Sequence, residues 1–81
     1  MAYIIFYKHP GDILEVLDHQ TKNYILKIKN LRLPLTSAVK MVHINMFQIS
    51  FEAPSDRIQR EFLLTTLGQM LHANEIYHFS L

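Results

Sequence analysis

The segment from Asp56 to Ala73 carries apolar residues at the spacing of an α-helix, and it constrains the fold more than any other part of the chain. At about 100° per residue, Leu63, Leu67 and Met70 mark the centre of one apolar stripe. Asn74 follows at a position where that residue type commonly ends a helix. A helix with such a stripe must bury it against another layer, so the rest of the chain must supply that layer.

Two residues can cap the start of this helix. Ser55 and Asp56 each carry a side-chain oxygen that can accept a hydrogen bond from a free amide of the first turn. Gln59 stands three residues after Asp56, an arrangement that resembles a capping box. An acidic residue at this end also suits the helix dipole. The sequence therefore predicts that the helix starts at Ser55 or Asp56.

The apolar stripe of this helix is wider than one core requires. Phe62 and Ala73 lie on one edge, and Leu64 and Leu71 lie on the other. The stripe spans roughly 200°, whereas about 100° suffices for a helix that lies on a single core. Either the loop Leu31–Leu35 covers the edge with Leu64 and Leu71, or that edge meets a second subunit or a protein partner. The predicted interface residues are Leu64, Leu71, Phe62 and Leu67.

In the stretch from Asp12 to Leu31 the spacing of the apolar residues fits both a β-strand hairpin and an α-helix. As a hairpin, Ile13–Leu17 is the first arm and Asn23–Lys29 is the second, with apolar residues and lysines on opposite faces. As a helix, apolar residues recur along one stripe of the whole stretch. We favour the hairpin, because the lysines alternate with apolar residues and helix formers are scarce between His19 and Tyr24. The predicted apolar face of the second arm is Tyr24, Leu26 and Ile28.

Three further segments are typical of strands. Tyr3–Tyr7 is a run of aromatic and β-branched residues without alternation, which suits a strand covered on both faces. Val39–Glu52 alternates, but its parity changes near Asn45, so we expect a tight turn or a bulge there. Ile76–Leu81 also alternates, and its predicted apolar face is Tyr77, Phe79 and Leu81.

Proline marks two breaks in this pattern. Pro10–Asp12 is a strong turn signal, and we expect Leu33–Leu35 to interrupt any regular element. The 81 residues form one domain, because a chain of this length builds one core. The predicted fold class is α+β, with an antiparallel sheet of about five or six short strands and one long C-terminal helix packed on it. The alternative is a ferredoxin-like β-α-β-β-α-β sandwich, in which Asp12–Leu31 is the first helix.

The stretch Phe51–Asp56, followed by the amphipathic helix, resembles the end of a pleckstrin-homology-like roll. This resemblance covers about the last third of the chain and implies a set of short strands closed by a helix. A strand after the helix departs from that pattern. Lys8 also stands alone where lipid-binding members carry a basic cluster, so phosphoinositide binding is not implied.

The residue types limit the chemistry open to this chain. It has no cysteine, which excludes disulfides, thiolate zinc sites and cysteine nucleophiles. Its two glycines, Gly11 and Gly68, exclude a phosphate-cradling loop and a nucleophile elbow. Asp12, Glu15 and Asp18 are typical surface acids rather than a catalytic pair. We therefore expect neither enzymatic activity nor a cofactor.

The chain contains five histidines, which raises the question of a metal site. No two of them form an HxxxH or HExxH pair. His72 and His78 straddle the end of the predicted helix, and His43 falls in a predicted strand. Because no carboxylate is spaced to complete a site, we expect no bound metal. The remaining two histidines are His9 and His19.

The charges are unevenly placed along the chain. No acidic residue occurs between Asp18 and Glu52. This stretch is either a solvated strand face or a weak surface for an anionic partner such as nucleic acid. The net charge of +1 is small for a dedicated nucleic-acid binder. The cations of the predicted anionic-partner surface are Lys22, Lys27, Lys29, Arg32 and Lys40.

The width of the apolar stripe favours a non-catalytic protein-interaction module, either a homodimer or a subunit that binds another protein. A small nucleic-acid-binding regulator that uses the segment Lys22–Lys40 is the alternative. Small secreted domains usually need disulfides, so the lack of cysteine favours a reducing, cytoplasmic setting. Met1–Tyr7 is too short for a signal-peptide core or a membrane span, so we expect no membrane association.

Overall fold

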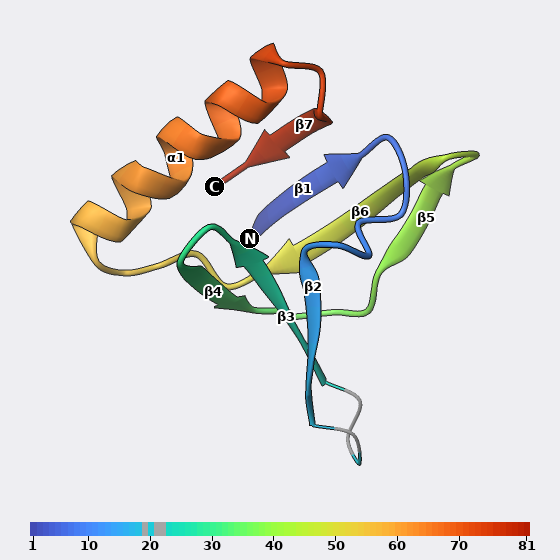
Figure 1. The fold of residues 1–81 in the computed structure, drawn as a ribbon, viewed down its shortest axis with the longest axis horizontal. Helices are drawn as coiled ribbons and strands as arrows, with labels where there is room; N and C mark the ends of the chain where they lie inside the picture. Colours follow the sequence, from blue (N-terminus) through green and yellow to red (C-terminus); the bar gives the residue numbers. More distant parts are fainter. Residues whose placement is uncertain (19, 21–22) are drawn as a thin grey trace.

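The computed structural model describes residues 1–18, 20 and 23–81, and these form seven strands and one helix in two antiparallel sheets (Figure 1). The α+β class is confirmed, but the single sheet of five or six strands is wrong, because the strands divide between two sheets. The four-stranded sheet has the order β5-β6-β1-β7 and comprises β1 (Ala2–Phe6), β5 (Lys40–His43), β6 (Met46–Phe51) and β7 (Ile76–Ser80). The three-stranded sheet has the order β2-β3-β4 and comprises β2 (Leu14–Asp18), β3 (Asn23–Ile28) and β4 (Leu31–Pro34). The helix α1 spans Arg57–His72.

The stretch Asp12–Leu31, whose apolar spacing fitted both a hairpin and a helix, is a hairpin. Strands β2 and β3 pair antiparallel, and Lys27 N–H donates to the Ile13 carbonyl at 2.7 Å, which extends the ladder to Ile13. The ferredoxin-like alternative with a helix over Asp12–Leu31 is therefore wrong. Residues 19, 21 and 22, which connect β2 to β3 in the sequence, lie outside the described residues.

One part of the ferredoxin-like alternative is nevertheless present. Strands β6 and β7 both pair antiparallel with β1, which lies between them. Helix α1 connects β6 to β7, so these elements form a split β-α-β unit. In this respect the fold departs from a pleckstrin-homology-like roll, because the strand that follows the helix joins the sheet beside the first strand.

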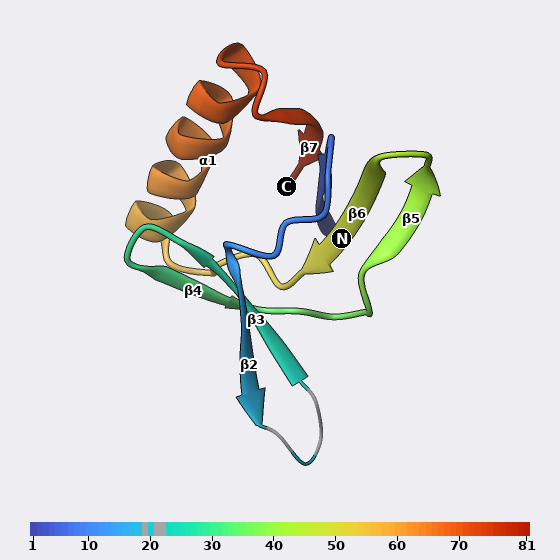
Figure 2. The same ribbon diagram turned by 45° about the vertical axis from the view of Figure 1, so that its right-hand side comes forward.

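Strand β1 is central in its sheet, but only one of its faces lies in the core. Ala2, Ile4 and Phe6 are buried, whereas Tyr3 and Ile5 on the other face are half-buried. The expectation that this strand is covered on both faces is thus wrong. Its neighbours β6 and β7 leave that second face without another layer (Figure 2).

Pro34 does not interrupt the chain's regular structure as expected. It ends strand β4, where it pairs with Ile25 of β3. Proline is tolerated there because β4 is an edge strand, whose outward backbone groups need no ladder partner. The Pro34 carbonyl accepts from Glu52 N–H at 3.0 Å, and Thr36 N–H donates to the Ser50 carbonyl at 3.0 Å. These bonds tie the end of β4 to the end of β6 and so join the two sheets.

The expected turn near Asn45 is present between β5 and β6. His43 pairs with Met46, and Asn45 has a positive φ of 61°, which asparagine tolerates better than most residues. In β7 the predicted alternation of apolar and exposed residues is wrong in part. Tyr77 is the extra residue of a bulge opposite the Ile5–Phe6 step, so it faces outward while Phe79 remains partly buried against the core.

The two ends of α1 are set by local hydrogen bonds. Asp56, rather than Ser55, caps the start, and its Oδ2 accepts from Gln59 N–H at 3.1 Å. At the other end Asn74 has a φ of 59°, Asn74 N–H donates to the Leu71 carbonyl at 3.1 Å, and Glu75 N–H donates to the Met70 carbonyl at 2.8 Å. This is a Schellman motif, and it confirms the predicted stop at Asn74.

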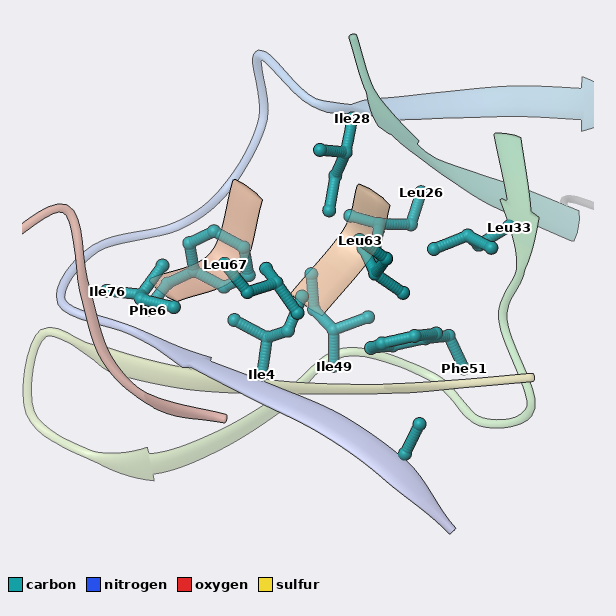
Figure 3. Packing of buried hydrophobic residues seen from close by; sticks show 11 residues of the cluster. Ile4, Phe6, Leu26, Ile28, Leu33, Ile49, Phe51, Leu63, Leu67 and Ile76 are labelled. Carbon is teal, nitrogen blue, oxygen red and sulfur yellow. The ribbon is translucent and has the colours of Figure 1, made fainter. Parts of the chain in front are cut away.

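A single core fills the space between the two sheets and the helix (Figures 2 and 3). The helix supplies Leu63 and Leu67, which are fully buried, and Thr66 lies beside them. The three-stranded sheet contributes Leu26, Ile28 and Leu33 to the same cluster. The four-stranded sheet contributes Ala2, Ile4, Phe6, Ile49, Phe51 and Ile76.

The cap at Asp56 gives a test of how the helix is held. Asp56→Ala removes the acceptor for Gln59 N–H, and we expect a loss of about 1 kcal/mol in the free energy of unfolding. For a domain of this size that loss lowers the Tm by roughly 4–8 °C. Asp56→Asn keeps the acceptor and should stay close to the wild type in thermal unfolding followed by circular dichroism. If both variants lose the same stability, the carboxylate charge and not the hydrogen bond holds this end.

Candidate interaction surfaces

One side of α1 carries large apolar side chains that no described element covers. Leu64 is 50% exposed and Leu71 is 39% exposed. At about 100° per residue, Arg60 and Gly68 lie on the same side of the helix. We call the set Arg60, Leu64, Gly68 and Leu71 the outer flank of α1. The strand that spans Leu31–Pro34 packs into the core through Leu33 and leaves this flank open.

The opposite side of α1 faces the three-stranded sheet. Lys29 Nζ lies 5.7 Å from the centroid of the Phe62 ring, a cation–π contact between the β3–β4 turn and the helix. A hollow of about 360 Å³ continues along this side, between Ile13 and Ile28 of the hairpin region and Met70 of the helix. Phe62 is therefore on the side of the helix away from Leu64.

The four predicted interface residues thus have three different positions. Leu64 and Leu71 share the outer flank, whereas Phe62 lies beside Lys29 on the other side. Leu67 is fully buried and belongs to the core. It lies at the centre of the apolar stripe, and the centre of a stripe is the part that faces the core most directly.

Glu15 lies between two cations of the predicted anionic-partner surface. Its carboxylate is 3.3 Å from Lys27 Nζ and 2.6 Å from Arg32 Nη2. The sheet register creates this arrangement, because Lys27 pairs with Arg32 and Glu15 pairs with Ile25 on the same face. Two of the predicted cations therefore share a counter-charge supplied by the neighbouring strand.

The remaining predicted cations do not join this pair. Lys29 lies in the β3–β4 turn, against Phe62, and has a φ of 53°. Lys40 belongs to β5 in the other sheet. Lys22 lies outside the described residues. The described part of the basic segment is thus divided among three places rather than gathered on one face.

The four-stranded sheet has an uncovered face with aromatic and polar residues. Cross-strand pairing aligns Lys40, Gln48, Ile5 and His78 in one row across all four strands. The Tyr3 and His78 rings lie 5.7 Å apart, and Tyr7 and Tyr77 form a T-shaped pair at 5.8 Å. None of residues 2–6, 40–43, 46–51 and 76–80, which make up these strands, is acidic. We call this surface the open sheet face.

Groups that would support chemistry do not converge in the described part of the chain. Across residues 1–18, 20 and 23–81, no three histidine or carboxylate side chains form a metal-binding group. His9 packs edge-on against the Phe47 ring at 5.3 Å, and His43 Nδ1 lies 3.3 Å from the Ile44 carbonyl oxygen. A hollow of about 500 Å³ lies between the hairpin and the β4–β5 connection, lined among others by His9, Asn23, Tyr24 and Thr36. Among the described residues that line it there is no carboxylate.

No described helix is long and apolar enough to cross a membrane. Comparisons of the chain with known protein families, with curated proteins and with solved structures found no match.

Sequence reasoning missed two parts of these surfaces. It did not include Gly68 among the predicted interface residues, although Gly68 lies one turn after Leu64 and borders the same apolar edge. The available signal was the cost of a glycine within a helix, about 1 kcal/mol relative to alanine. It also missed the open sheet face, because the rows across that face depend on strand pairings between distant segments.

The position of Glu15 predicts a measurable effect on anion binding. Glu15→Gln removes the counter-charge of Lys27 and Arg32, so we expect the variant to elute from heparin at a higher salt concentration than the wild type. The free energy of unfolding should change by less than about 1 kcal/mol, because both ion pairs are solvent-accessible. Glu52→Gln is the matched control, since it makes the same change of net charge at a carboxylate that forms no ion pair within the described residues. An equal shift in both variants would show that only net charge matters.

Proposed function

We propose that this chain is a non-catalytic protein-interaction module that self-associates or binds a protein partner through the outer flank of α1, in a reducing, cytoplasmic setting. The observation that carries the proposal is the exposure of Leu64 and Leu71 on the same side of one helix. They lie seven residues apart, two helical turns, so they lie on one line along the helix, which we call the ridge. Apolar surface exposed together in one place is typical of protein-binding sites.

The total surface of the chain supports this proposal. The accessible area is 5706 Å², whereas a compact monomer of 9.6 kDa exposes about 5,100 Å². The excess is of the same order as the ~800 Å² that each partner buries in a standard protein interface. The projecting β2–β3 and β5–β6 hairpins also account for part of it (Figure 2). A partner that covers the outer flank would bring the exposed area closer to that of a compact protein.

The test uses a double substitution on the ridge. Leu64→Glu/Leu71→Glu places two charges where a partner must exclude water, so association should weaken by about tenfold or more. Sedimentation velocity over a range of concentrations measures self-association, and pull-down with the wild type as bait measures other partners. Circular dichroism should show an unchanged helix, because both side chains are exposed.

Ile58→Glu/Thr65→Glu is the matched control. These positions are also seven residues apart on α1 and exposed, but they lie on the side away from the ridge. The control should associate like the wild type. If the wild type is monomeric and binds no protein, or if the control and the ridge variant lose association equally, the proposal is wrong.

Binding of single-stranded nucleic acid is a second candidate function, and the open sheet face favours it. An acid-free sheet face with rings such as Tyr3 and His78 has the character of surfaces on which bases stack. Lys40 in the same row supplies a positive charge for the phosphate backbone. The basic segment supports this function less, because Glu15 already neutralises part of it.

Fluorescence anisotropy with a labelled single-stranded oligonucleotide tests this second candidate. We expect His78→Ala and Lys40→Glu each to weaken binding by about fivefold or more, and added salt to weaken it further. Lys27→Glu/Lys29→Glu should have a smaller effect, because Lys27 lies in the other sheet and Lys29 in its β3–β4 turn. A larger effect of the Lys27 and Lys29 changes would move the site to the basic segment, and salt-independent or undetectable binding would reject both sites.

A further inference from the structure

Thr66 is a buried polar side chain whose hydroxyl has no partner in the described part of the chain. The residue is 5% exposed, yet its hydroxyl makes no hydrogen bond to any residue among 1–18, 20 and 23–81. Every fully buried side-chain oxygen and nitrogen among these residues does have a partner, so the Thr66 hydroxyl must keep some accessible surface. Thr66 lines the hollow of about 360 Å³ between α1 and the hairpin region, so this accessible surface opens into the hollow. The hydroxyl is therefore placed to bind a polar group that enters there.

Apolar side chains line this hollow from both sides. Ile28 is 4% exposed, and Ile13 and Met70 are partly buried against the core, so the hollow continues the core toward the surface. Thr66 and Ala73 line it from α1 and lie seven residues apart, so it runs for about 10 Å along the helix. Its volume is at the small end of the range for small-molecule sites. These dimensions suit a short aliphatic chain.

The two ends of the hollow carry opposite charges. Lys29 lines one end, where its Nζ lies 5.7 Å from the centroid of the Phe62 ring, and Phe62 stands one turn before Thr66 on α1. Glu75 lines the other end, just beyond the last turn of the helix. Within the described residues neither Lys29 nor Glu75 makes an ion pair. An anionic group is therefore attracted to the end with Lys29 and Thr66 and repelled from the end with Glu75.

A second lysine in the wall already has a counter-charge. Lys27 also lines the hollow, but its Nζ lies 3.3 Å from a carboxylate oxygen of Glu15. An ammonium with a carboxylate partner attracts a second carboxylate less strongly. Among the described lining residues, Lys29 is thus the cation that a ligand meets without a counter-charge.

We propose that this hollow binds a small aliphatic carboxylate. The carboxylate accepts hydrogen bonds from the Lys29 ammonium and the Thr66 hydroxyl, and the aliphatic chain packs along Ile28 and Met70. The site lies on the side of α1 away from the outer flank, so it is separate from the surface of the proposed function.

Methionine methyl signals of the isotope-labelled protein test the site, with octanoate as the probe. Titration should shift the Met70 signal until it saturates, because Met70 lines the hollow, whereas the Met41 signal should stay in place. Met41 is 65% exposed in β5 of the other sheet, so it reports octanoate that merely coats apolar surface. Met70→Leu and Met41→Leu assign the two signals by nuclear magnetic resonance. If the Met70 signal does not move, or if both signals move together, the proposal is wrong.

Octylammonium tests the charge that the site prefers. It has the chain of octanoate and the opposite charge, so we expect its dissociation constant to be about tenfold higher or more. Glu75→Gln should leave the dissociation constant of octanoate unchanged or lower it, because it removes a negative charge from the far end of the hollow. Equal binding of the two ligands, or weaker binding of octanoate by Glu75→Gln, would overturn the proposal.

Thr66→Val removes the hydroxyl and keeps the branched shape of the side chain. We expect the dissociation constant of octanoate to rise about tenfold, which corresponds to the loss of one hydrogen bond to a charged group. The Tm should stay the same or rise, because the hydroxyl has no partner in the described chain. Thr65→Val is the matched control, since it makes the same change at an exposed neighbour that does not line the hollow, and it should bind octanoate like the wild type. A Thr66→Val variant that loses stability and binds octanoate as before would show that the hydroxyl serves only the fold.

Lys29→Gln tests the cation without disturbing a buried residue. Removal of its charge should raise the dissociation constant of octanoate about threefold or more. Lys40→Gln makes the same change of net charge in β5 of the other sheet and should leave binding unchanged. An equal loss in both variants would show that octanoate responds to net charge alone, which rejects the site.

The outer flank supplies a further control that separates this inference from the proposed function. Leu64→Glu/Leu71→Glu should bind octanoate like the wild type, because those leucines do not line the hollow. If octanoate does not bind, the interaction module still stands on its own tests. If the ridge variant loses octanoate as well as protein association, the two surfaces are not independent and the site as described is wrong.

Discussion

The rest of the structure depends on one core that three surfaces share. Leu63 and Leu67 of α1 meet Ile4 and Ile49 of one sheet and Leu26 of the other, and all five are fully buried (Figure 3). Neither sheet has a second layer of its own, so the inner face of each depends on the same few helix residues. In a chain this short, one core uses most of the available apolar surface, and the helix can bury only a narrow row. The outer flank of α1 and the open sheet face are what this arrangement leaves uncovered.

The same geometry gives the two uncovered surfaces different characters. The outer flank is a short apolar surface on one side of a helix, which suits a protein partner that is itself helical. The open sheet face is broad and acid-free, and its rings already contact one another, which suits a flat or extended ligand. The two surfaces do not overlap in sequence or in side chains, so a partner bound to α1 would leave the open sheet face available.

The basic segment shows how sheet register can remove a predicted site. Along the sequence, Lys27 and Arg32 lie in a stretch without acids, which suggests an unbalanced positive surface. In the sheet, β2 brings Glu15 within 3.3 Å of Lys27 and 2.6 Å of Arg32. Neutralisation therefore comes from a residue that is distant in sequence and adjacent in space, and a charge count along the chain cannot reveal it.

The sequence by itself determined the elements whose causes are local. The cap at Asp56, the stop at Asn74, the hairpin turn at Asn45 and the alternation over Asn23–Ile28 follow from hydrogen bonds and periodicities within a few residues. It also indicated that the edge with Leu64 and Leu71 exceeds what one core covers. Only the tertiary structure decided that the strands form two sheets, that Tyr77 bulges outward, that Leu67 is buried while Leu64 is not, and that Glu15 lies between two cations. These outcomes depend on pairings between segments far apart in the chain, where a shift of one residue exchanges the faces of a strand.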